Sequence, residues 1–219
     1  MAETTRPTWD QTFLTLAKET AKRSKDPSTK VGAVIVGPDN EVRSLGYNCF
    51  PRGVDDDAPG RLDRPLKYKW LEHAERNAVY NAARVGIPLK GCSIYVSWLP
   101  CSDCSRAIIQ SGLTELVVED LSVPERWRAD FLVSMTMLRE AKIHLRQPDS
   151  KTEIAPFDVL WKGRFVRLPD GMVSVVEWVN FYDARHLNVA VKDSGEKYGL
   201  RTYSMTIEEM ETSLVKSDG

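Results

Sequence analysis

The sequence predicts an α/β protein in which helices cover the faces of a mixed β-sheet. Segments whose apolar residues recur at helical spacing alternate with short β-branched runs as far as about residue 148. The hydrophobic fraction of 42% and the charged fraction of 28% are ordinary for a globular protein, and 219 residues can bury a sizeable core. A formal net charge of −1 argues against a general polyanion-binding protein.

The first elements are a helix and a hairpin. An amphipathic helix is expected over about 9–23, because apolar side chains recur at helical spacing between Lys and Glu residues. Strands are expected over 31–36 and 41–47, joined by a turn at 37–40 that contains Gly, Pro, Asp and Asn. A loop rich in Pro, Gly, Asp and Arg follows over 48–66, and loops of this length are often functional.

The alternation continues to the end of the predicted N-terminal domain, residues 1–148. Further helices are expected over about 73–84, 101–110 and 125–141, and further strands over about 93–96, 114–118 and 142–145.

Residues 151–219 differ and are expected to form a small α+β extension. Strands are predicted over 157–163 and 172–179, and Thr206 to Glu209 resembles a capping box before a short helix. No chemical motif is found there, so a role in assembly, in covering an active site or in regulation remains open.

Two short motifs indicate a catalytic zinc site. They are His73-Ala74-Glu75 and Cys101-Ser102-Asp103-Cys104. Catalytic zinc usually has three protein ligands of the imidazole, thiolate or carboxylate type and an open fourth position, and His73, Cys101 and Cys104 supply three. Both motifs stand at predicted helix starts, where the helix dipole favours thiolates.

Glu75 is the predicted acid–base residue. A carboxylate beside zinc-bound water can take its proton and pass it to a departing amine. The pattern His-x-Glu followed by Pro-Cys-x-x-Cys is typical of zinc nucleobase deaminases, in which the Glu is not a ligand. Cys101 and Cys104 alone are also compatible with a redox pair or a structural zinc site, but no fourth Cys or His lies near in sequence.

Four ordered blocks of sequence resemble the deoxycytidylate deaminases of the cytidine deaminase superfamily. The blocks are residues 24–36, 46–53, 73–78 and 91–96. The resemblance implies a three-layer cytidine-deaminase-like fold with a five-stranded sheet, zinc held by His73, Cys101 and Cys104, and proton transfer by Glu75. It implies the hydrolysis of dCMP to dUMP and ammonia in the metabolism of pyrimidine nucleotides. It also implies a homo-oligomer, often a hexamer, with dCTP and dTTP as effectors.

Several residues are candidates for contacting the substrate. Asn48 matches the Asn of the family that binds the sugar, although it is also compatible with a residue that caps its own loop. Arg23, Ser24 and Lys25 are candidates for the phosphate, against the alternative of solvated surface positions. Trp98 is expected to form a wall of the base pocket or to pack in the core. Cys49 replaces a Gly found in many family members, which leaves details of the second block open.

Other functions remain open from the sequence. The substrate could be dCTP, a modified dCMP, a free base, a nucleoside, tRNA or single-stranded DNA. Ser97-Trp98-Leu99-Pro100-Cys101 is similar to a segment of polynucleotide cytidine deaminases, but near-zero charge makes a nucleic acid an unexpected partner. A zinc-stabilised binding module without catalysis is a further alternative, which the presence of Glu75 disfavours. No apolar leader or membrane-length segment is found, so we expect a cytoplasmic protein without a membrane partner.

Overall fold

The computed structural model describes residues 6–154, 165–168, 173–181, 186–192 and 200–213. The chain divides into two compact units, Met1–Glu153 and Ile154–Gly219. Each unit is described by itself.

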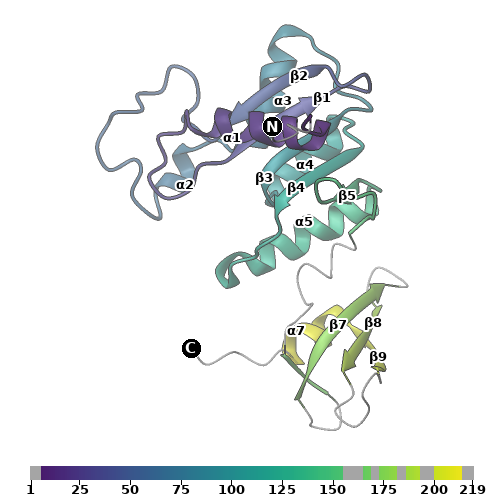
Figure 1. Cartoon of the computed structure of the whole chain (residues 1–219). Coiled ribbons are helices and arrows are strands. Elements are labelled where there is room, and N and C mark those ends of the chain that lie inside the picture. The colour runs from purple at the N-terminus through teal and green to yellow at the C-terminus, as the bar shows by residue number, and fades with distance from the viewer. Residues whose placement is uncertain (1–5, 155–164, 169–172, 182–185, 193–199, 214–219) are drawn as a thin grey trace, which may run out of the picture. The chain divides into compact units, whose positions relative to one another are not determined.

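The N-terminal unit contains a five-stranded mixed sheet, as predicted (Figure 1). Its strands are β1 (Gly32–Val36), β2 (Val42–Tyr47), β3 (Ser93–Trp98), β4 (Glu115–Asp120) and β5 (His144–Arg146). The order across the sheet is β2-β1-β3-β4-β5. Strand β1 is antiparallel to β2 and β3, whereas β3, β4 and β5 are parallel. Every residue of β1 is buried, which explains its unbroken β-branched run.

Helices cover both faces of this sheet and give the expected three layers. They are α1 (Trp9–Ala21), α2 (Lys67–Trp70), α3 (Ala74–Val85), α4 (Ser102–Gln110) and α5 (Arg128–Glu140), the last preceded by the 3-10 turn η1 (Glu125–Trp127). The predicted helices agree with the structure to within a few residues. Helix α2 was not predicted, because a single turn is too short to show helical periodicity.

The two faces of the hairpin β1–β2 pack against different helices. On one face Val34 and Val36 lie in a buried cluster with Phe13 and Leu14 of α1. Gly46 of β2 pairs with Ala33 and lies on the opposite face, against α3. The approach is so close that a Cβ on Gly46 would lie 2.1 Å from the carbonyl oxygen of Ala74. This contact sets the position of the first turn of α3.

The C-terminal unit is a four-stranded antiparallel meander followed by a helix. Its elements are β6 (Phe165–Arg167), β7 (Val173–Phe181), β8 (His186–Lys192), β9 (Leu200–Thr206) and α7 (Ile207–Ser213). Leu168, Val176, Val191, Met205 and Met210 are buried in it.

Sequence expectations for this unit were met in part. The strand expected over 172–179 corresponds to β7. The capping box is formed: Thr206 N donates to Glu209 Oε2 over 2.7 Å, and Glu209 N donates to Thr206 Oγ1 over 3.1 Å. Strands β8 and β9 were not predicted, and the strand expected over 157–163 lies outside the described residues. Within the described ranges, no helix has the length and hydropathy needed to span a membrane.

Candidate active site

The two sequence motifs meet at the N-termini of neighbouring helices. Helix α3 begins immediately after His73, and α4 begins immediately after Cys101, each with its N-cap residue in an extended conformation. His73 Nδ1 lies 3.4 Å from Cys101 Sγ and 3.4 Å from Cys104 Sγ. The three donor atoms all lie within 4.8 Å of one another. Residues far apart in the chain therefore present one imidazole and two sulfurs to a common point.

This cluster fits a zinc ion. Tetrahedral zinc with its usual bonds to nitrogen and sulfur holds the two kinds of donor about 3.5 Å apart. The observed nitrogen–sulfur separations of 3.4 Å agree with that spacing. Imidazole and thiolate are also the ligand types that zinc prefers. The three side chains therefore fit a zinc ion in ligand type and in nitrogen–sulfur spacing.

The three donors differ in ionisation: the hydrogen bond to Cys101 raises the pKa of His73 to about 9, and burial raises the pKa of Cys104 well above its ordinary value, so both must lose a proton to bind a metal. The thiol of Cys104 donates to Cys101 and lowers the pKa of Cys101 to about 4, with His73 acting in the same direction and burial opposing it. Cys101 is therefore a thiolate at neutral pH, which is the form that binds metals. Glu75 is 3% exposed, and burial raises its pKa above the ordinary value for a glutamate. A raised pKa suits a group that must both accept and release a proton.

An ion-pair chain joins the two helix starts. Arg76 of α3 pairs with Glu72 at 2.5 Å and with Asp103 of α4 at 3.2 Å. Because Glu72 precedes His73 and Asp103 lies between the two cysteines, this arginine holds the ligand-bearing segments against each other. This role could not be predicted from the sequence, because pairing between the two helices depends on the fold.

Helix α5 supports the cysteine segment from the other side. Asp130 accepts hydrogen bonds from the backbone N of Ser102 at 2.9 Å and from the Ser102 hydroxyl at 2.5 Å, and so caps α4. The Ser134 hydroxyl donates to the carbonyl of Pro100 over 2.7 Å. Neither residue belongs to a recognisable local motif, so neither could be predicted from the sequence.

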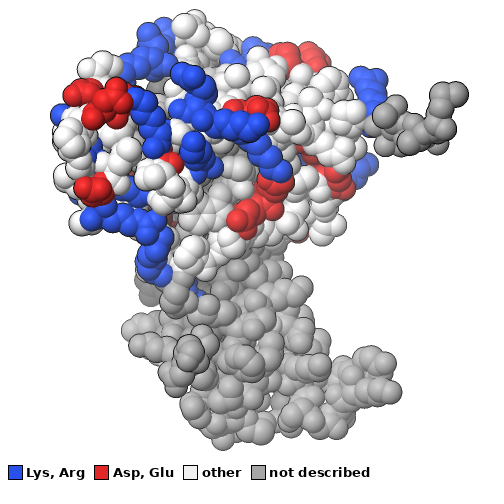
Figure 2. Space-filling view, turned by 60° about the vertical axis from the view of Figure 1, so that its left-hand side comes forward, with Lys and Arg blue, Asp and Glu red and all other residues white. Residues whose placement is uncertain are grey.

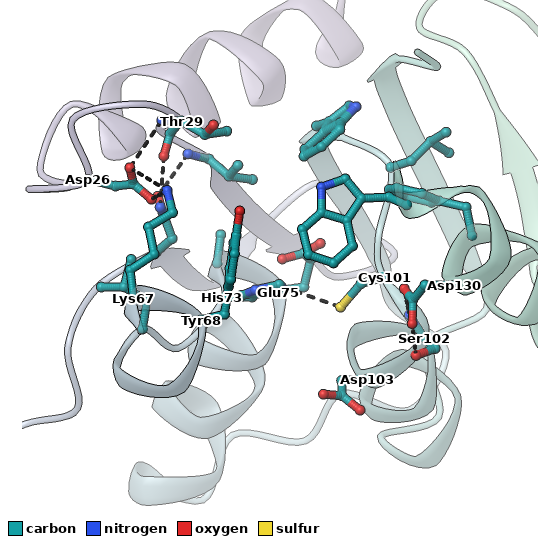
Figure 3. A pocket seen from close by; sticks show the side chains of 18 of the residues that line it. Asp26, Thr29, Lys67, Tyr68, His73, Glu75, Cys101, Ser102, Asp103 and Asp130 are labelled. Atoms are coloured by element: carbon teal, nitrogen blue, oxygen red, sulfur yellow. Dashed lines mark hydrogen bonds and ion pairs between the residues drawn. The ribbon is translucent and has the colours of Figure 1, made fainter. Parts of the chain in front are cut away.

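A pocket of about 270 Å³ opens over the cluster. Figure 3 shows His73, Glu75 and Cys101 in its centre, with Asp26 and Lys67 on one side and Asp130 and Ser102 on the other. Its aromatic lining residues are Tyr68, Trp98, Trp127 and Phe131. The rings of Trp98 and Phe131 lie 5.7 Å apart. The pocket therefore combines apolar walls with a few polar groups, as small-molecule sites do.

Two of the predicted substrate residues line this pocket. Trp98 does so, and its Nε1 donates to the carbonyl of Ser122 over 2.8 Å, which fixes the plane of the indole. Asn48 lines it as well. The Asn48 side chain accepts from Val31 N over 2.8 Å and donates to the Thr29 carbonyl over 2.9 Å, so it also shapes its own loop.

The other three predicted substrate residues are not among the residues that line the pocket. Every lining residue belongs to the described range 6–154. Arg23 is exposed just beyond α1. Ser24 is 3% exposed and its hydroxyl accepts from Asp26 N, so it serves the local turn. Lys25 pairs with Asp56 and Asp57 at the surface.

Different cations line the pocket in their place. These are Arg64, Lys67 and Arg126. They are not among the predicted site residues, although the long loop over 48–66, which ends next to α2, is a segment expected to be functional. Its functional significance depends on the fold bringing it beside η1.

Comparisons with known proteins agree with this geometry. The family model described as the cytidine and deoxycytidylate deaminase zinc-binding region matches residues 7–120. Deoxycytidylate deaminase of Mus musculus is 41% identical over 116 residues, which are 50% of this chain and 63% of that protein. The match therefore spans less than two thirds of the mouse relative. An uncharacterised deaminase of Aliivibrio fischeri is 37% identical over 139 residues, with 63% of this chain and 91% of that protein covered.

A solved structure shares the fold. The dCMP deaminase of cyanophage S-TIM5, determined in complex with dCMP and dUMP, superposes with a TM-score of 0.53 at 20% identity. The superposition covers 65% of this chain and 98% of the phage protein. The five-stranded sheet, the motif residues and the matched family model agree, and the chain belongs to the cytidine and deoxycytidylate deaminase family.

Proposed function

We propose that this protein is a zinc-dependent hydrolase that converts dCMP to dUMP with release of ammonia. The observation that carries the proposal is the convergence of His73, Cys101 and Cys104 on one point, with the buried Glu75 in the same pocket. The named deoxycytidylate deaminases among its relatives support the choice of substrate. The activity is assigned to residues 1–148, with 151–219 as a separate extension.

His73, Cys101 and Cys104 would hold the zinc, which would supply Lewis-acid activation of water at neutral pH. Glu75 takes a proton from the water that attacks C4 of the cytosine ring. Glu75 then delivers that proton to N3 of the ring and carries the hydroxyl proton to the amino group, so the C4–N bond breaks, the C4 carbonyl forms and ammonia leaves. A buried carboxyl group with a raised pKa can serve in both directions.

The remaining polar and aromatic side chains orient the nucleotide. Trp98 and Phe131 offer aromatic faces to the base. Asn48 uses one amide hydrogen for Thr29 and one oxygen lone pair for Val31, which leaves a second hydrogen and a second lone pair. These remaining positions serve the sugar hydroxyl in our proposal.

A mononucleotide is favoured over a polynucleotide. Figure 2 shows a face of the N-terminal unit on which Lys and Arg side chains are interspersed with Asp and Glu. A strand of nucleic acid binds best to an uninterrupted basic groove. A homo-oligomer, dCTP and dTTP as effectors, and a cytoplasmic location remain part of this proposal.

The test is ammonia release by the zinc-loaded full chain. The panel contains dCMP, dCTP, deoxycytidine, cytosine, guanine and single-stranded DNA, with and without added dCTP and dTTP. We expect dCMP to be preferred. Preference for another member would refute the assignment of dCMP but leave the zinc chemistry intact.

The role of Glu75 is tested separately. Glu75→Gln keeps the size of the side chain and removes the proton carrier. We expect turnover to fall by about 10²–10⁴-fold, the usual contribution of a positioned acid–base group, with zinc content unchanged. Loss of zinc in this variant, or retained turnover, would contradict the role.

A further inference from the structure

The charged side chains of the pocket differ in whether the protein itself neutralises them. The carboxylates outside the proposed zinc centre all have partners. Asp26 accepts from Lys67, Asp103 pairs with Arg76 and Arg106, and Asp130 accepts from Ser102. Cations therefore compensate Asp26 and Asp103, whereas Asp130 is hydrogen-bonded by neutral groups of Ser102 and keeps its negative charge.

Lys67 is a neutralised cation. It is 4% exposed, and its Nζ lies 2.8 Å from Asp26 Oδ2 and 2.6 Å from Ser28 Oγ. Buried pairs of this kind satisfy each other and leave little charge for a third group. Lys67 therefore stabilises the pocket wall.

Arg64 and Arg126 are in a different situation. Both line the pocket and both are exposed. Arg64 has one long hydrogen bond, of 3.4 Å, to Ser28 Oγ. The Arg126 guanidinium lies 5.8 Å from the ring centroid of Trp127. Neither guanidinium forms an ion pair with any side chain in the described part of the chain.

A ring contact joins the two segments of chain that carry the arginines. Trp127 of η1 meets Tyr68 of α2 edge-on, with ring centroids 5.2 Å apart and planes at 84°. Arg126 directly precedes Trp127, and Arg64 lies in the segment that leads into α2. The loop before α2 and the turn η1 are separated by the whole of α3, β3, α4 and β4. Each contributes to the same pocket one guanidinium that forms no ion pair with the side chains the structure describes.

We propose that Arg126 and Arg64 form an anion subsite that receives the substrate phosphate and makes the enzyme selective for a nucleoside monophosphate over a nucleoside. A guanidinium binds phosphate oxygens through two parallel hydrogen bonds, which gives both strength and direction. This inference rests on the proposed deamination and assigns its specificity to two residues. It replaces the sequence-based candidates Arg23 and Lys25, which do not line the pocket.

The experiment compares substrates with and without phosphate on the zinc-loaded full chain. The variants are Arg126→Ala, Arg64→Ala and the double variant, and the matched control is Arg84→Ala, an exposed arginine at the end of α3 outside the pocket lining. We expect each pocket variant to lower kcat/KM for dCMP by about 10–100-fold, the worth of one charge-assisted hydrogen-bonded contact. Values for deoxycytidine should match those of the control.

Binding provides a readout that does not depend on turnover. Titration calorimetry with dUMP and with deoxyuridine should show weaker dUMP binding in the variants and unchanged deoxyuridine binding. Arg126→Lys keeps the charge but lacks the planar fork, so it should bind dUMP with intermediate affinity.

The outcomes separate this inference from the proposed function. Equal losses for dCMP and deoxycytidine would mean that the arginines only shape the pocket, and unchanged dCMP values would remove them from recognition. Either result overturns the subsite while leaving deamination intact. If the wild-type protein deaminates neither substrate, the proposed function fails, and the dUMP titration still decides the subsite.

Discussion

Replacing Gly46 by alanine should damage the active site from the far side of helix α3. The added Cβ would lie 2.1 Å from the Ala74 carbonyl oxygen and 2.4 Å from the Ala78 nitrogen, and both obstacles are backbone atoms. Restoring an ordinary contact requires α3 to move by roughly 1 Å, because non-bonded carbon and oxygen do not approach closer than about 3 Å. That movement carries His73 and Glu75 with it.

The expected losses follow from this displacement. Overpacking of this kind costs about 1–3 kcal/mol, and each kcal/mol lowers the melting temperature of a unit this size by about 2–4 °C. A displacement of 1 Å at reacting groups can cost about 10²-fold in rate. Thermal unfolding followed by circular dichroism and kcat for dCMP measure the two effects.

Gly37→Ala is the matched control. Its Cβ would come within 1.9 Å of Glu41 Oε1, which is the movable end of a side chain, so the clash can relax. We expect near-wild-type stability and activity in this variant. If Gly46→Ala behaved like Gly37→Ala, the argument that the glycine sets the position of α3 would be refuted.

Three further predictions concern the pocket and its support. Burial opposes ionisation of Asp26, but hydrogen bonds from Lys67 and Ser28 outweigh it and hold the pKa of the Asp26 carboxyl below its ordinary value. The ion pair of Asp26 with Lys67 should therefore stabilise the fold above about pH 4. This stabilisation should be lost as the pH falls through the lowered pKa. Asp26→Asn should therefore lower the free energy of unfolding at pH 7 by about 3–5 kcal/mol and make that free energy decline less steeply in acid. Urea titrations at several pH values measure both effects. If the free energy of unfolding fell equally steeply in acid for the variant and the wild type, the assignment would be contradicted. Asp130→Ala should remove the cap of α4, cost about 1 kcal/mol in stability and weaken zinc retention against a chelating dye, whereas an unchanged rate of zinc loss would separate the cap from the ligands. Removing zinc with a chelator should lower the melting temperature, because the metal joins α3 to α4, and an unchanged value would confine zinc to chemistry.

Local patterns in the sequence were enough to predict much of this protein. Alternating helical and β-branched segments gave the order of elements in the N-terminal unit, because the periodicity of buried positions is written into the chain itself. The motif around His73 and the cysteine pair predicted the ligand cluster, because their chemistry is specific and their spacing is fixed by helix starts. The structure places the three donor atoms together as that prediction required.

Only the tertiary structure decided which charges face the pocket. Arg23, Ser24 and Lys25 have the chemistry of phosphate contacts, but none of them is among the residues that line the pocket. The pocket cations Arg64 and Arg126 belong to a loop and a 3-10 turn that carry no periodic signal and meet through the contact of Tyr68 with Trp127. The sequence does not show whether a charged side chain is neutralised by a partner, because the tertiary structure determines that partner. The partner in turn determines whether the side chain can bind a ligand.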